Sequence, residues 1–129
     1  MKSFFLSRLQ SFQHAFRGWF YVLQTQRNVW IHGVIAIIVF ISGLWLRLPP
    51  HDWAVIILTA ALVFTAEFIN TSIEVTLDLA SPDTHPLAKI GKDVGAAAVL
   101  VSALAAILIG LLLLGPPLWL KLISHIPNP

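Results

Sequence analysis

Three long apolar segments decide what this chain can fold into. Residues 94–114 (VGAAAVLVSALAAILIGLLLL), 29–46 (VWIHGVIAIIVFISGLWL) and 53–66 (WAVIILTAALVFTA) contain no Asp, Glu, Lys or Arg. A helix of about 20 residues extends roughly 30 Å, which matches the hydrocarbon core of a bilayer. The sequence therefore predicts an all-α membrane protein with three transmembrane helices, at about 29–47, 53–79 and 94–114. Asp52 is placed to cap the second of these helices. Residues 81–93 are expected to form a solvated loop, and the third helix is expected to stop at Gly115, Pro116 and Pro117.

Composition excludes several other classes of protein. Of the 129 residues, 57% are hydrophobic and 11% are charged, which favours a single membrane domain (1–129) over a soluble core. The net charge of +2 is small and the basic residues are scattered, so nucleic acid is not expected as a partner. The absence of cysteine excludes disulfides and thiol chemistry. The first 28 residues lack a signal-peptide pattern, so we expect the internal helices to direct membrane insertion.

Residues 4–24 have the period of an amphipathic helix. Their apolar side chains recur at alternating spacings of four and three, at Phe5, Leu9, Phe12, Phe16, Trp19 and Leu23. Too many polar residues stand between them for a span, and Arg8 and Arg17 suit anionic head groups. The pattern predicts a surface helix in the plane of the membrane interface, because the chain has no soluble domain on which this helix could pack.

The apolar segment 53–66 continues directly into a row of polar residues. Glu67, Asn70, Glu74 and Asp78 follow at spacings that place them on one helix face, within an arc of about 80°. With Trp53 at one interface, Glu67 lies about 21 Å into the membrane and Glu74 reaches the opposite boundary. Neighbouring carboxylates repel unless a cation or proton lies between them, which indicates a metal or proton site. A solvated helix end is the alternative, and spacing alone does not decide between them.

Residues 67–78 also match a known signature. The pattern E-x-[apolar]-N-[TS]-[SA]-[apolar]-E-x-x-[apolar]-D is typical of small prokaryotic diacylglycerol and undecaprenol kinases, and the chain has EFINTSIEVTLD there. HPLAKIGKD (85–93) and RNVWIH (27–32) match as well, so the chain resembles this family over nearly its whole length. The resemblance implies ATP-dependent phosphorylation of a membrane lipid alcohol, giving phosphatidic acid or undecaprenyl phosphate. It also implies a homotrimer with shared active sites.

The resemblance further implies roles for individual residues. Glu67 is the implied catalytic base and Glu74 a magnesium ligand. The implied nucleotide-binding residues are Asn70, Asp78, His85, Lys92, Asp93 and Arg17. Taken without the resemblance, Asp93 is more simply a cap of the third span, Lys92 a snorkelling residue, and His32 a hydrogen-bonded interior histidine.

The chain carries no Walker-type phosphate loop and no protein-kinase catalytic loop. A kinase of this kind would need a cation to neutralise the β and γ oxygens of ATP, and a carboxylate to take the proton of the acceptor hydroxyl. Mg²⁺ and ATP are therefore the expected cofactor and co-substrate.

Gln26 departs from the family pattern. Many members have a glutamate there, which is thought to share magnesium with the glutamate that matches Glu74. An amide oxygen can also bind magnesium but brings no charge, so we predict Gln26 as a weaker metal ligand.

The basic residues divide unevenly between the two ends of the predicted spans. Arg47 and Lys121 lie at one end, and the other end has Lys2, Arg8, Arg17, Arg27, Lys89 and Lys92. This asymmetry predicts an inner-membrane protein whose N-terminus and acidic cluster face the cytoplasm, where ATP is available.

Small residues recur every four positions along the third span, at Ala98, Ser102, Ala106 and Gly110, and they indicate close helix packing, including between subunits. An oligomer would also shield the polar face of the second span from lipid. Two other functions remain open at this point: a non-enzymatic assembly that uses the acids as a cation or proton path, and a degenerate kinase that serves as a scaffold. Nucleotide binding and turnover would separate them from an active kinase.

Overall fold

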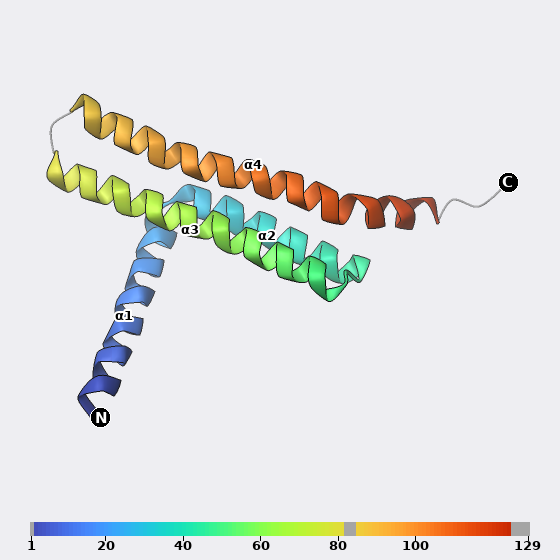
Figure 1. Cartoon of the computed structure of the whole chain (residues 1–129), viewed down its shortest axis with the longest axis horizontal. Coiled ribbons are helices and arrows are strands. Elements are labelled where there is room, and N and C mark those ends of the chain that lie inside the picture. Colours follow the sequence, from blue (N-terminus) through green and yellow to red (C-terminus); the bar gives the residue numbers. More distant parts are fainter. Residues whose placement is uncertain (1, 82–84, 125–129) are drawn as a thin grey trace.

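Helix α3 (Pro50–Ala80) lies at the centre of the molecule, with α2 (Arg27–Leu46) and α4 (Pro86–Ile123) roughly along it (Figure 1). Helix α1 (Lys2–Thr25) projects from this bundle at a steep angle. The structure, a computed structural model, describes residues 2–81 and 85–124, with side chains from residue 7 onward. The side chain of Phe5 therefore lies outside the described part.

The expected all-α class with three spans is confirmed. Helices α2, α3 and α4 are each long and apolar enough to cross a membrane. At 1.5 Å per residue α3 is about 46 Å long and α4 about 57 Å, so both exceed a bilayer core of about 30 Å. Their polar ends must therefore reach water on at least one side.

The start of α3 differs from the expectation that Asp52 caps it. The helix begins at Pro50 with Pro49 as its cap residue, and Asp52 lies inside the first turn. Proline suits the first helical position because its fixed φ is helical and its missing N–H would have no partner there. The assignment of Asp52 as the cap is wrong for this reason.

Helix α4 is longer than the predicted span at both ends. It begins at Pro86 rather than near residue 94. His85 caps it, because the His85 Nδ1 accepts a hydrogen bond from the Leu87 N–H (3.2 Å). Most of the expected loop at 81–93 is therefore helical. Asp93 lies well inside α4, so its assignment as the cap is wrong.

The other end of α4 passes through Pro116 and Pro117 and continues to Ile123. Proline interrupts backbone hydrogen bonds and was expected to end the helix near residue 114. A tertiary contact holds the extension instead: the Lys121 ammonium donates to the Trp45 carbonyl (2.7 Å) and lies 4.2 Å from the Trp45 ring centroid. The C-terminal turns of α4 are thereby attached to the end of α2.

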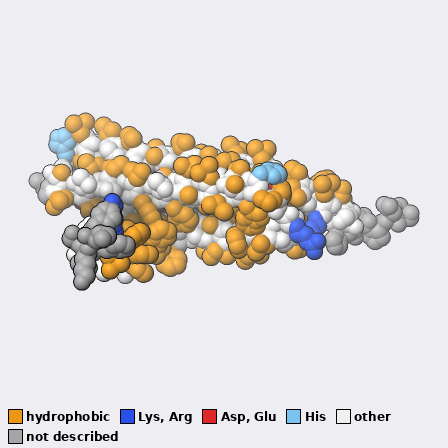
Figure 2. Space-filling model, turned by 60° about the horizontal axis from the view of Figure 1, so that its bottom comes forward, with side chains coloured by type: hydrophobic (Ala, Val, Ile, Leu, Met, Phe, Trp, Pro, Cys, Tyr) orange, Lys and Arg blue, Asp and Glu red, His pale blue; other side chains and the backbone are white. Residues whose placement is uncertain are grey.

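Most large apolar side chains face outward. The buried hydrophobic set is small and consists of Val22, Val29, Leu48, Val63 and Val99. Figure 2 shows hydrophobic side chains along the whole length of the bundle, with charged groups near its ends. An apolar surface of this extent needs lipid or other protein chains to cover it.

Candidate functional site

The inner face of α3 carries the buried polar side chains of the described part of the chain. Glu67 is 1% exposed, Thr71 2% and Asn70 6%. Burying a carboxylate or an amide is costly unless polar partners surround it, so these residues need partners on the neighbouring helices. The partners come from the first turns of α2 and from its junction with α1.

Glu67 is held against α2. Its Oε1 lies 3.7 Å from His32 Nε2, and the Asn28 side chain, one turn earlier on α2, lies beside the same carboxyl group. Oε1 itself has no hydrogen-bond partner among the described residues. The interpretation of His32 as a simple interior histidine missed its position beside Glu67, although the RNVWIH motif contains both of the α2 partners.

Glu74, two turns after Glu67, receives two amide donors. Asn70 Nδ2 donates to Oε1 (2.9 Å) and Gln26 Nε2 donates to Oε2 (3.2 Å). Gln26 is the cap residue of α2 at its junction with α1, 48 positions away in sequence from Glu74. The structure thus brings together three of the residues that were predicted from motifs far apart in the chain.

The side chains around Glu74 provide few ligands for a magnesium ion. No group of three or more His, Cys, Asp or Glu side chains that could hold a metal occurs in residues 2–81 and 85–124. Glu74 offers a carboxylate and Gln26 offers an amide oxygen once its amide turns over, while the Asn70 amide holds the Glu74 carboxylate from its own helix. Mg²⁺ commonly takes one or two carboxylates together with substrate phosphates and waters. The donor set therefore fits a magnesium ion that arrives with a nucleotide, rather than a cage made by protein alone.

Asp78 and Lys92 form an ion pair between α3 and α4, one turn beyond Glu74. Both side chains are partly exposed, so the pair can separate to meet a ligand at little cost. The structure does not bring the other predicted nucleotide-site residues into this cluster. Asp93 and Arg17 are exposed and form no ion pair with a described residue, and the His85 ring caps α4.

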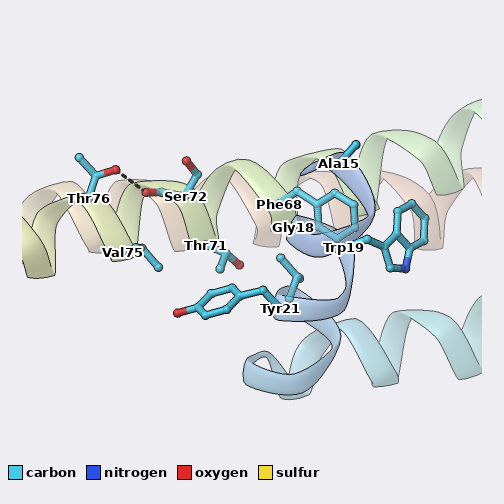
Figure 3. Close-up of a pocket in the computed structure, with 10 residues that line it drawn as sticks. Ala15, Gly18, Trp19, Tyr21, Phe68, Thr71, Ser72, Val75 and Thr76 are labelled. Atoms are coloured by element: carbon cyan, nitrogen blue, oxygen red, sulfur yellow. Dashed lines mark hydrogen bonds between the residues drawn. The ribbon is translucent and has the colours of Figure 1, made fainter. Parts of the chain in front are cut away.

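A groove of about 470 Å³ runs between α1 and α3, and sequence reasoning did not find it (Figure 3). Trp19 and Phe68 meet edge to face at one end, with ring centroids 5.1 Å apart. The groove is lined by Ala15, Gly18, Trp19, Tyr21, Val22, Phe68, Thr71, Ser72, Val75 and Thr76. The only sequence signal for it was the apolar stripe of α1, which contains Trp19. A tryptophan in such a stripe is typical of a membrane interface and does not by itself indicate a groove.

The Thr71 hydroxyl links this groove to Glu67. It donates to the backbone carbonyl of Glu67 (2.9 Å). Phe68, which follows Glu67 in the chain, lines the groove. The groove therefore passes beside the backbone of Glu67, whereas the carboxyl group of Glu67 contacts α2.

Comparison with known proteins identifies the family. Residues 13–114 match the family model for prokaryotic diacylglycerol kinase. The chain belongs to the prokaryotic diacylglycerol kinase family. It is 41% identical over 109 residues to the undecaprenol kinase of Bacillus subtilis, covering 84% of this chain and 89% of that protein.

Two diacylglycerol kinases are also similar to the chain. The one from Synechocystis is 42% identical over 111 residues, covering 85% of this chain but 63% of the relative's length. The one from Escherichia coli K12 is 28% identical over 95 residues, covering 68% of this chain and 78% of the relative. The chain is thus a lipid kinase, and a kinase of this family takes its phosphate from ATP.

Proposed function

We propose that this lipid kinase transfers the γ-phosphoryl group of ATP to the hydroxyl of diacylglycerol or undecaprenol, with Glu67 as the base. The observation that carries the proposal is the buried Glu67 carboxyl group, whose Oε1 has no hydrogen-bond partner among the described residues, two turns from a carboxylate flanked by amides. The lipid oxygen attacks the γ-phosphorus, the bond from that phosphorus to the β–γ bridging oxygen breaks, and ADP leaves. Glu67 accepts the proton of the lipid hydroxyl.

Glu74 and Gln26 would hold the magnesium that accompanies ATP, beside Asn70. When bound, Mg²⁺ neutralises charge on the β and γ oxygens. Glu74 supplies the only full charge of this trio, and the two amides orient its carboxylate. Lys92 would leave Asp78 to meet a phosphate, while Asp78, Asp93, His85 and Arg17 remain proposed contributors to the nucleotide site.

The groove between α1 and α3 suits the acyl or prenyl chain of the acceptor. Its lining is mainly apolar, and its hydroxyl groups come from Tyr21, Thr71, Ser72 and Thr76. Because the Glu67 carboxyl group contacts His32 on α2, it must turn from α2 toward the groove to meet the acceptor hydroxyl. We propose that lipid binding accompanies this rotation.

We also propose a homotrimer with shared active sites in the inner membrane. The outward-facing apolar side chains of α2, α3 and α4 support association with other chains. So do the small residues at 98, 102, 106 and 110 on α4, because they permit close helix contact in lipid.

Labelled ATP and purified protein in lipid micelles, with each alcohol offered separately, test the proposed function. We expect labelled phosphatidic acid or undecaprenyl phosphate to form only when ATP and magnesium are both present. Formation of one product alone would identify the acceptor. Absence of both products, with nucleotide still bound, would support a scaffold role instead.

Gln26→Glu should make the protein respond more strongly to magnesium. A carboxylate at this position would stand beside Glu74, and the two charges repel unless a cation lies between them. We therefore expect a lower melting temperature without magnesium, a larger rise when magnesium is added, and a lower magnesium requirement for turnover. Gln24→Glu, on α1 near the same junction, controls for added charge. Identical magnesium titrations for Gln26→Glu and the parent would place residue 26 outside the metal site.

Membrane orientation can be tested by single cysteines, because the native chain has none. Cysteine at Ser81, after α3, should react with an impermeant reagent only from the cytoplasm. Cysteine at Asn128, which lies outside the described residues, should react only from the other side. Labelling of Ser81→Cys from the periplasm would separate the acidic cluster from cytoplasmic ATP and contradict the proposed function.

A further inference from the structure

Helices α3 and α4 form the most extensive interhelical contact in the described part of the chain. In its first turns α4 carries two glycines four residues apart, Gly91 and Gly95, followed by Val99. Gly95 and Val99 are buried. Small residues at this spacing allow two backbones in lipid to approach closely, and here the approach occurs beside the polar face of α3.

Gly95 is in direct contact with Asn70. A Cβ at Gly95 would come closer than 3.0 Å to Asn70 Oδ1, a distance that real side chains essentially never show, and 3.8 Å from the Asn70 Cα. Asn70 is only 6% exposed, so its amide has little room to move away. The same steric limit would apply if Oδ1 and Nδ2 of the Asn70 amide exchanged places.

The other end of the Asn70 amide donates to Glu74 Oε1 (2.9 Å). The amide is therefore held between Gly95 on α4 and the Glu74 carboxylate on its own helix. A methyl group at position 95 would push the amide out of line with Glu74, or push α4 away from α3. In either case the directed hydrogen bond to Glu74 weakens, because such bonds depend steeply on angle.

Gly91 offers a matched comparison in the same pair of helices. A Cβ there would lie 2.8 Å from Leu77 Cδ1, but the next nearest atoms, also of that side chain, are 3.9 Å away. Leu77 can turn the end of its side chain, and its side chain is apolar. Crowding at Gly91 thus tests the packing of α3 on α4 without touching the amide of Asn70.

We infer that Gly95 is a positioning residue, whose lack of a side chain keeps the Asn70 amide directed at the Glu74 carboxylate. The inference rests on the proposed function, because it assigns Gly95 an effect on magnesium nucleotide through Glu74. Gly95 itself touches no substrate.

The test compares Gly95→Ala with Asn70→Ala and with two controls, Gly91→Ala and Gly115→Ala. A Cβ at Gly115 meets nothing within 4 Å. We expect Gly95→Ala and Asn70→Ala each to raise the magnesium requirement for turnover and for binding of a fluorescent ATP analogue about 10-fold, because a hydrogen bond to a charged group is weakened or lost. Both controls should stay within about twofold of the parent. A merely structural role for Gly95 would lower the amount of active protein and leave its magnesium requirement unchanged.

A double-mutant cycle separates the contact from a general packing defect. In the parent, Gly95→Ala should lower both the melting temperature and the magnesium affinity. In the Asn70→Ala background the obstructing amide is absent, so adding Gly95→Ala should change neither quantity further. If Gly95→Ala fails to fold alone, the double variant should still fold as Asn70→Ala does.

Equal losses from Gly95→Ala in both backgrounds, or parent-like magnesium titrations for Gly95→Ala, would overturn the inference. Failure of the double variant to fold would do the same. If the proposed function is wrong, the parent chain will phosphorylate neither lipid, and this result distinguishes that case from failure of the inference. The melting-temperature cycle still tests the Gly95–Asn70 contact in that case.

Discussion

Glu67→Gln is expected to reduce lipid phosphorylation by about 10²- to 10⁴-fold, the usual contribution of a positioned general base. Glutamine keeps the shape of the side chain and can still interact with Asn28 and His32, but it cannot accept the proton of the lipid hydroxyl. Turnover with each lipid alcohol, measured at saturating ATP and magnesium, reports this loss.

Nucleotide binding and oligomer size should remain those of the parent, because Glu67 lies two turns from the proposed nucleotide site. Asp52→Asn is the matched control: it makes the same carboxylate-to-amide change in the first turn of the same helix and should leave turnover unchanged. Parent-like turnover in Glu67→Gln would remove Glu67 from the role of base. A parallel loss of ATP binding would instead indicate a structural defect.

Glu74→Gln is expected to act on magnesium nucleotide rather than on proton transfer. The substitution removes the only full charge from the trio with Gln26 and Asn70, and it replaces one of two acceptor oxygens with a donor. One of the two amide donors then faces another donor. We expect the magnesium requirement to rise roughly 100-fold, because a hydrogen bond or ligand contact to a charged group contributes about 1.5–3 kcal/mol.

Turnover of Glu74→Gln should recover in part at high magnesium, whereas that of Glu67→Gln should not. Titrating magnesium against both turnover and binding of the ATP analogue distinguishes the two variants. A titration of Glu74→Gln that overlays the parent's would show that Glu74 does not hold the metal.

Residue spacing predicted the helices and the face of α3 that carries the acids. The positions of Glu67, Asn70, Glu74 and Asp78 follow from 3.6 residues per turn, and α3 is continuous from Pro50 to Ala80. Helix ends were predicted less well, because caps and tertiary contacts decide them. The His85 cap and Pro86 start α4 early, and the contact of Lys121 with Trp45 holds it past two prolines.

The motifs named the residues whose roles remain predictions, but they did not predict how these residues are arranged. Gln26 and Glu74 were paired only by analogy with the family, and their contact depends on how the α1–α2 junction packs against α3. The proximity of His32 to Glu67 depends on the relative rotation of α2 and α3. Periodicity along a single helix carries no information about either.

The sequence by itself determined that this chain forms three membrane-spanning helices, because the length and apolar character of a segment set its free energy in a bilayer. It also determined which side chains share the polar face of α3. Only the tertiary structure decided which atoms meet there. The angles and rotations with which α1, α2 and α4 pack on α3 depend on contacts between residues far apart in the chain. Those contacts bring Gln26 to Glu74, His32 to Glu67 and the bare Gly95 backbone to Asn70.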